Sequence, residues 1–110
     1  MAITINIYYT GPAGNARKFA QEMVSSGTVD MIRAEKGNLR YAYFLPMDQD
    51  ETVLLIDSWE SQEALDAHHH SAVMQTIIGL REKYGLHMRV ERYALTDETP
   101  PESDQPYIRE

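Results

Sequence analysis

The sequence has 110 residues, of which 43% are apolar and none is cysteine, and its formal net charge at neutral pH is −7. This length is sufficient for one domain with a small core. The acidic balance argues against nucleic acid as a partner, because phosphate binding requires a basic face, and it disfavours anionic membrane surfaces for the same reason. Without cysteine there is no disulfide framework, thiolate zinc site or cysteine nucleophile.

The N-terminal segment predicts a strand rather than a targeting signal. It has no basic region and no apolar run long enough for a signal peptide or a membrane span. We therefore expect a soluble protein of the cytoplasm with no membrane partner. Residues 2–9 alternate around Ile3, Ile5 and Ile7, which indicates a strand, and the glycine- and proline-rich residues 10–14 end it.

A helix and two strands are expected next. Asn15 can cap a helix that runs to about Glu35 with a weak point at residues 25–27, and Gly37 suits the left-handed position after its end. Residues 38–47 and 52–59 are typical strands. The polar loop between them is short enough for the two strands to pair as a hairpin.

The last part of the predicted domain contains a second helical region and a fourth strand. Ser61 is a suitable N-cap for a helix that begins at Gln62. Residues 73–84 continue with a buried stripe at helical spacing, and Gly85 ends it. Residues 86–95 form the fourth strand. The stripe consists of Val73, Ile77, Leu80 and Tyr84.

Residues 96–110 differ in composition from the rest of the chain. They contain three prolines, five acidic residues and one arginine, and so carry −4 of the total charge. We interpret residues 1–95 as one domain and residues 96–110 as an acidic, proline-rich tail. The tail is either disordered or an arm that lies on a partner chain.

The predicted order β-α-β-β-α-β is that of the split βαβ, so we expect an α+β, ferredoxin-like fold with an antiparallel four-stranded sheet. Both helices cover the same face of such a sheet. Residues 53–56, VLLI, form a continuous apolar run, which is typical of a strand covered on both faces. The simplest second cover is another copy of the chain, and we expect a homodimer.

Three consecutive histidines, His68 to His70, raise the question of a metal site. Two ligands on one helix should be three or four residues apart, and no second histidine has that spacing. We therefore predict no metal site. His69 and His70 suit a solvated helix end. His68, three residues after Leu65, faces inward and is either a satisfied core residue or a donor or base that lines a pocket.

Two segments resemble the antibiotic biosynthesis monooxygenase (ABM) domain. These are RAEKGNLRY at residues 33–41 and WESQEALDAH at residues 59–68. The family pattern is a helix end E-x-G, an aromatic strand, a hairpin and then W-E-S-x-E-A-x-x-x-H. The resemblance covers residues 3–95 and implies a ferredoxin-like protomer that pairs as a dimeric α+β barrel. Some members oxidise polyketide quinols or anthrones with molecular oxygen and no cofactor. Related branches degrade haem or isomerise a phosphorylated signal.

The resemblance also implies site residues. Trp59 matches the tryptophan that ends the third strand, and His68 matches the helix histidine of many members. Asn6 matches a strand-one asparagine beside the pocket, and Tyr41 or Tyr43 falls on the aromatic strand. Two departures are clear: the S-x-H-F of many relatives is Ser-Ala-Val-Met here, and the axial histidine of the haem-degrading branch is absent.

These residues favour a cofactor-independent monooxygenase that acts on a small aromatic, quinol- or anthrone-like substrate, with no cofactor. His68 would be the base or donor, and Asn6 would orient a substrate oxygen. Trp59, with Tyr41 and Tyr43, would stack on a flat ring, and Met74 and Ile78 would close an apolar wall. The same aromatic residues and Asn6 also suit ordinary core and sheet packing.

Two other functions stay open. One is a non-oxidative enzyme, such as an isomerase, in the same pocket, for which Arg40, Arg89 and Arg92 are candidate anchors of a phosphorylated ligand. The other is a small-molecule-binding dimer without chemistry.

Overall fold

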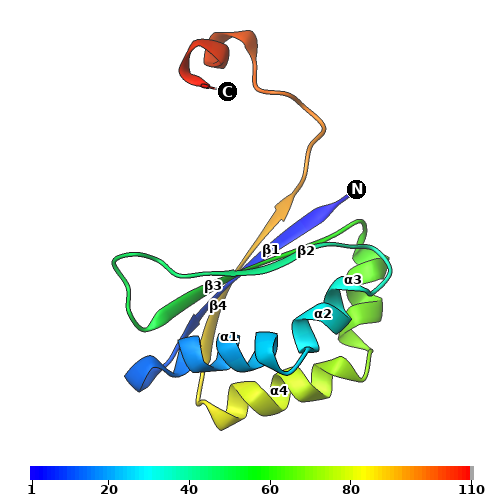
Figure 1. The fold of residues 1–110 in the computed structure, drawn as a ribbon. Coiled ribbons are helices and arrows are strands. Elements are labelled where there is room, and N and C mark those ends of the chain that lie inside the picture. The colour runs from blue at the N-terminus through cyan, green and yellow to red at the C-terminus, as the bar shows by residue number, and fades with distance from the viewer. Residues whose placement is uncertain (110) are drawn as a thin grey trace.

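The computed structural model describes residues 1–109, and its elements follow the expected order (Figure 1). The strands are β1 (Ile3–Thr10), β2 (Asn38–Phe44), β3 (Thr52–Trp59) and β4 (His87–Ala94). The helices are α1 (Asn15–Ser25), α2 (Thr28–Arg33), α3 (Gln62–His69) and α4 (Val73–Lys83). Two 3-10 turns, η1 (Pro12–Gly14) and η2 (Glu102–Tyr107), precede α1 and follow β4.

The four strands form one antiparallel sheet in the order β2-β3-β1-β4. All four helices lie on one side of this sheet, and the other side is bare (Figure 1). This arrangement confirms the predicted ferredoxin-like α+β fold. A single chain cannot show a second copy, so the dimeric barrel stays a prediction.

Alternation along β1 separates the two faces of the sheet. Ile3, Ile5 and Ile7 are between 6% and 8% exposed and pack under the helices. The register places Ile5 opposite Asp57 and Asn6 opposite Ile56. Residues directly opposite each other in an antiparallel pair project to the same face. Asp57 therefore faces the helices, and Asn6 faces the bare side.

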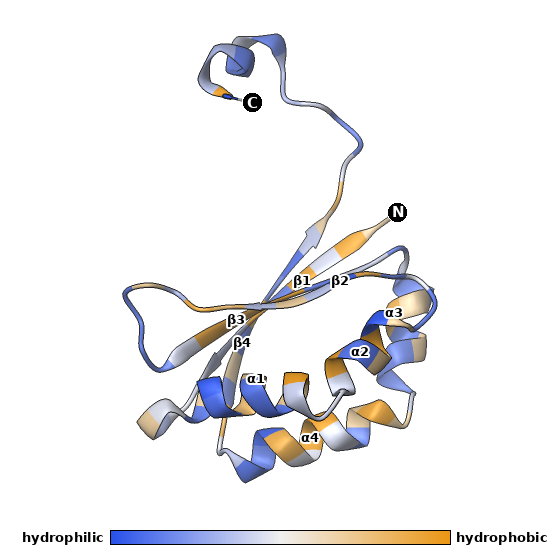
Figure 2. Ribbon diagram, in the orientation of Figure 1, coloured by the Kyte–Doolittle hydropathy of each residue, from blue (hydrophilic) through white to orange (hydrophobic). Residues whose placement is uncertain are grey.

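The core between sheet and helices is formed by one side of each helix. Apolar and hydrophilic bands alternate along α1 and α4 in Figure 2, as expected for helices with one buried face. The buried residues of α4 confirm three positions of the predicted stripe, Val73, Ile77 and Leu80. Leu54 and Ile56 of β3 are only partly buried because no helix covers their side of the sheet.

The predicted weak point in the first helical region is confirmed. α1 ends at Ser25, and α2 begins at Thr28 after Gly27, whose φ of 81° is left-handed. A left-handed residue cannot continue an α-helix, and glycine adopts this conformation without steric cost. The second piece ends at Arg33, slightly before the predicted end.

The two predicted N-caps behave differently. Ser61 caps α3, since its Oγ accepts a hydrogen bond from the Ala64 N–H at 3.1 Å. Asn15 does not cap α1, which begins after Gly14 without a side-chain cap. Its Nδ2 instead donates to the Tyr84 carbonyl at the end of α4, at 3.1 Å. The asparagine therefore ties two helices together.

The tail leaves β4 on the bare side of the sheet and ends away from the body of the domain (Figure 1). Its hydrogen bonds within residues 97–109 reach only other residues of the tail from Thr96 onward. Tyr107 is 88% exposed. The domain boundary at residue 95 and the contact of the tail with a partner stay predictions.

Candidate functional site

His68 is the buried polar residue on the inner side of α3. Leu65 and His68 are the buried residues of this helix. The His68 side chain is 3% exposed, and its Nδ1 lies 2.7 Å from Oε2 of Glu35. When Nδ1 donates to this carboxylate, the other ring nitrogen, Nε2, is the one that can accept a proton.

A tight turn between α2 and β2 brings Glu35 to His68. Gly37 in this turn has a left-handed φ of 84°, and a Cβ on it would lie 2.6 Å from Cβ of Ala64. Only glycine permits this approach without displacing α3. The Glu60 N–H donates to the Gly37 carbonyl at 2.8 Å. The E-x-G and W-E-S segments of the sequence are thus in direct contact.

The indole of Trp59 stacks on the His68 imidazole. The ring centroids are 4.8 Å apart and the planes are inclined by 28°. Trp59 is fully buried, and its Nε1–H donates to Oδ1 of Asp57 at 2.5 Å. Asp57 and Trp59 are two residues apart on β3 and so project from the same face. The stack and the hydrogen bond together fix the position of the indole.

Asp57 is a buried carboxyl group with an altered acidity. Burial raises its pKa to about 7; the hydrogen bond from Trp59 lowers it, the negative charge of Glu35 raises it and the positive charge of Arg81 lowers it. A carboxyl group with this pKa gains or loses its proton near neutral pH. Such groups are candidates for functional sites.

Three tyrosines complete this layer. Burial raises the pKa of Tyr9, Tyr41 and Tyr43, so their hydroxyl groups keep their protons and can donate hydrogen bonds. Arg81 of α4 donates to the Tyr9 hydroxyl from Nε at 3.1 Å and from Nη2 at 2.9 Å. The Tyr41 ring lies edge-on to Tyr43 at 6.0 Å and to His68 at 6.3 Å. Within residues 1–109, the buried Tyr43 hydroxyl has no hydrogen-bond partner.

The structure brings four of the predicted site residues together in this layer and separates the others. Met74 is partly buried and packs against the core. Ile78 is 43% exposed, so the expectation that it closes an apolar wall is corrected. The helical rotation turns the neighbouring Ile77 inward instead. The four residues that converge are Trp59, His68, Tyr41 and Tyr43.

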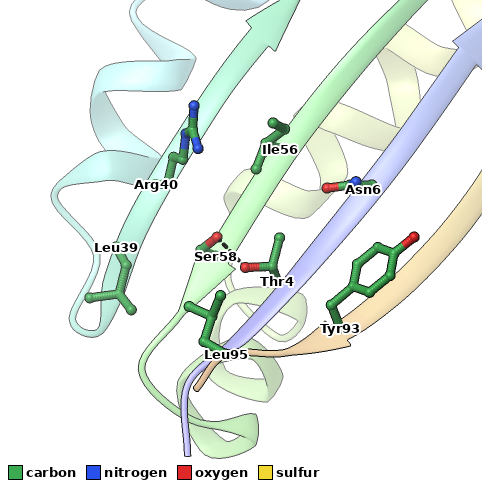
Figure 3. A pocket seen from close by; sticks show the side chains of 8 residues that line it. All are labelled: Thr4, Asn6, Leu39, Arg40, Ile56, Ser58, Tyr93 and Leu95. Carbon is green, nitrogen blue, oxygen red and sulfur yellow. Dashed lines mark hydrogen bonds between the residues drawn. The ribbon is translucent and has the colours of Figure 1, made fainter. Parts of the chain in front are cut away.

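Asn6 lies on the opposite face of the sheet from His68, which corrects the expectation that both line one pocket. Strand parity is the reason, because the isoleucines at positions 5 and 7 take the face under the helices. Asn6 instead lines a cleft of about 500 Å³ on the bare face (Figure 3). Its Oδ1 is buried and has no hydrogen-bond partner among residues 1–109. The cleft is lined by Thr4, Asn6, Leu39, Arg40, Ile56, Ser58, Tyr93 and Leu95.

Sequence reasoning missed four polar residues of the helix-covered layer. Asp57 shares the strand parity of Trp59, and Tyr9 shares that of the buried isoleucines, so both could have been placed on this face. Glu35 is the acidic residue of the E-x-G segment. No pattern in the sequence indicates a role for Arg81, because its contact with Tyr9 depends on how α4 crosses the sheet.

The three consecutive histidines have three different environments. His68 is buried, whereas His69 and His70 are exposed, and His70 Nδ1 lies 2.7 Å from the Asp66 carbonyl oxygen. Partial burial of its ring lowers the pKa of His69, although the residue as a whole is exposed. Over residues 1–109, no three histidine or acidic side chains gather as metal ligands. In the same range no helix has the length and apolar character that crossing a bilayer requires.

A family model described as "Antibiotic biosynthesis monooxygenase" matches residues 2–79. The chain belongs to the antibiotic biosynthesis monooxygenase family. The match includes every residue of the helix-covered layer described above except Arg81. No curated protein sequence matches the chain.

Solved structures share the ABM fold at low sequence identity. SnoaB from Streptomyces nogalater, a cofactor-independent oxygenase, is 13% identical with a TM-score of 0.73; the alignment covers 91% of this chain and 98% of SnoaB. A candidate ABM protein from Deinococcus radiodurans is 18% identical with a TM-score of 0.76, over 92% and 98% of the two chains. Rv0793 from Mycobacterium tuberculosis is 23% identical with a TM-score of 0.67, over 91% and 100%. These similarities concern the fold.

The space beside His68 in this ABM domain is filled by its own side chains. Trp59 and Tyr41 are almost completely buried. The most distinct clefts on residues 1–109 have volumes of about 250 to 600 Å³, and neither His68 nor Trp59 lines any of them. A ligand that reaches His68 must therefore displace side chains of this layer. Tyr43 and Met74 are the partly buried groups there.

Proposed function

We propose that the protein is a cofactor-independent monooxygenase that acts on a small aromatic substrate of the quinol or anthrone type. The observation that carries this proposal is the buried His68 imidazole, which stacks on Trp59 and bonds to the partly exposed carboxylate of Glu35. It combines an oriented imidazole with a flat apolar surface in a layer shielded from water. Family membership and the fold shared with SnoaB, a cofactor-independent oxygenase, support the same reaction type.

Each residue has a role that follows from its chemistry. His68 accepts the phenolic proton at Nε2, and Glu35 holds the imidazole in the required tautomer and stabilises the imidazolium. The Tyr43 hydroxyl, which bonds to no other group among residues 1–109, donates to the substrate oxyanion. The face of the Trp59 indole that now stacks on His68 supports the aromatic ring of the substrate.

This reaction needs no cofactor because the deprotonated substrate itself reduces oxygen. For an anthrone, the ring CH₂ group and O₂ give a ring carbonyl and one water molecule. One oxygen atom enters the product and the other leaves in water, so the atoms and electrons balance without an external reductant. The protein supplies the base, the donor to the anion and a dry environment.

The bare face of the sheet supports a homodimer as the working form. It exposes Phe44 and Tyr93 and leaves Ile56 only partly buried. The Oδ1 of Asn6, which accepts no hydrogen bond from residues 1–109, lies on the same face and would find a donor on a covering chain. A second copy that packs its own bare face here would bury both features, as in an isologous interface.

Oxygen uptake with a panel of quinols and anthrones tests the proposal. At least one compound should consume oxygen in the presence of the protein, and His68→Gln should lower its turnover about 10²- to 10⁴-fold, the usual contribution of a general base. Asp66→Asn, on the exposed side of the same helix, serves as the control and should leave turnover unchanged. If oxygen uptake is the same for the wild type and His68→Gln, His68 is not the base.

The filled space beside His68 favours one competing function, a dimeric domain without chemistry. In that case no compound of the panel consumes oxygen and none raises the melting temperature, because no cavity opens. An isomerase of phosphorylated substrates has less support. Arg40 and Arg89 lie on the bare face, since Arg89 is in register with Tyr8. Arg92 is exposed on the edge strand β4 and donates to the Gln62 side chain at the start of α3.

A further inference from the structure

The carboxyl group of Asp57 is buried beneath the proposed site and has no role in the chemistry described above. It is 5% exposed and lies in the sheet between Ile5 of β1 and Tyr41 of β2, with which it is in register. Its one hydrogen bond within residues 1–109 is the one it accepts from the Trp59 indole at 2.5 Å. No basic side chain forms a salt bridge with it in this range.

A carboxylate in this position needs a physical reason. Burying an anion without a paired cation is costly, and a well-packed apolar residue would avoid that cost. Its hydrogen bond holds the indole that stacks on His68. Asp57 thus acts on the imidazole through Trp59, whereas Glu35 contacts the imidazole directly at Nδ1.

The charged and titratable groups that face Asp57 come from every element packed against it. They offset its charge only in part, through Arg81. Tyr9, Tyr41 and Tyr43 are neutral phenols, Glu35 is anionic, and Arg81 is shared with the Tyr9 hydroxyl. His68 lies beyond the indole.

We propose that Asp57 is a positioning residue of this site: its carboxylate holds the Trp59 indole against His68, and uptake of a proton by that carboxyl group releases the indole. A hydrogen bond to a charged acceptor is about twice as strong as one to a neutral acceptor, so protonation of Asp57 weakens the hydrogen bond that holds the Trp59 indole. The released indole is the part of the layer that can move to admit a flat ring. The admission of a substrate ring rests on the proposed function, whereas the movement of the indole does not.

Trp59 provides a direct readout because it is the sole tryptophan in the sequence. In the ¹⁵N-labelled protein, its indole N–H gives a single resonance. We expect this resonance to shift in one transition with a midpoint near pH 7. The transition should disappear in Asp57→Asn, in which the acceptor no longer titrates, and should persist in His68→Gln. Asp66→Asn, with its exposed carboxyl group removed, should behave as the wild type.

Two results would overturn the proposal. One is the absence of any indole transition between pH 5 and pH 9. The other is a transition that disappears in His68→Gln, since the imidazole would then be the titrating group. If Asp57→Asn does not fold, ¹³C-labelled aspartate in the wild-type protein replaces it, and one carboxyl carbon must titrate with the same midpoint as the indole. These measurements need no substrate, so a failure of the oxygen-uptake test leaves them valid.

Discussion

The two faces of the same sheet have opposite characters. The helix-covered face holds a layer of aromatic and ionisable side chains in which Glu35, His68, Trp59 and Asp57 contact one another in a row. The bare face carries exposed apolar side chains and a cleft with an amide oxygen, that of Asn6, to which no donor among residues 1–109 bonds. The covered face is therefore packed within one chain, whereas the bare face would be covered by the second copy that we propose. In these two proposals, chemistry and assembly belong to different faces of the sheet.

Truncation of an aromatic residue on each face should give the largest difference. Trp59→Ala should lower the free energy of unfolding by about 3–5 kcal/mol, because it leaves a cavity in a packed core. Phe44→Ala, on the bare face, should lower that of the monomer by less than about 1 kcal/mol. Urea unfolding at low protein concentration measures both. Equal losses would show that the two faces are packed alike.

Asp57→Asn should stabilise the protein in a pH-dependent manner. Since burial raises the pKa of Asp57 from 3.8 to about 7, the folded state binds the proton more tightly, and wild-type stability falls as pH rises between these values. The substitution removes this loss. At pH 8 the variant should be more stable by at most about 4 kcal/mol, and the gain should vanish near pH 4. Thermal unfolding between pH 4 and pH 8 measures it, and a gain independent of pH would contradict the assignment.

A charge on the bare face should weaken the homodimer. Ile56→Glu would bury a carboxylate in each copy and bring like charges together, at a cost of about 1.5–3 kcal/mol, or roughly a 10- to 100-fold rise in the dimer dissociation constant. Sedimentation over a range of concentrations measures this constant. Ile78→Glu, on the exposed side of α4, is the matched control and should have no effect. A wild-type protein that stays monomeric at all concentrations tested would contradict the proposed homodimer.

Removal of the tail should have the smallest effect on the domain. A chain that ends at Thr96 keeps the hydrogen bond from the Leu95 N–H to the Ala2 carbonyl and loses only hydrogen bonds made within the tail. The free energy of unfolding of the monomer should change by less than about 0.5 kcal/mol, as for a surface change. Urea unfolding of the shortened chain measures this. A loss well above this value would place the tail inside the cooperative unit.

Local rules anticipated much of the fold and part of the site. Alternation at Ile3, Ile5 and Ile7 marked the buried side of β1, and the cap at Ser61 set the start of α3 and thus the inward direction of His68. The same parity rule, applied to Asn6, would have placed it on the bare face. The family pattern instead suggests a place beside His68, and the structure corrects this expectation.

Other features lay beyond any local rule. The hydrogen bond between Glu35 and His68 joins residues 33 positions apart. It depends on the close approach of Gly37 to α3, which no periodicity encodes. Arg81 reaches Tyr9 across 72 positions because α4 crosses the sheet at that point. Whether Ile77 or Ile78 faces inward also depends on the rotation of α4.

The sequence by itself determined the order of the elements, the side of β1 that is buried and the inner side of the helix on which His68 lies, because each depends on alternation, helical spacing or capping within a few residues. Only the tertiary structure decided which partners these residues have. It paired Glu35 with His68, set Asp57 beneath Trp59 and placed Asn6 on the other face. The reason is physical: an ion pair, a ring stack or a buried carboxyl group depends on distances of a few ångströms between segments that only the packed sheet and helices bring together.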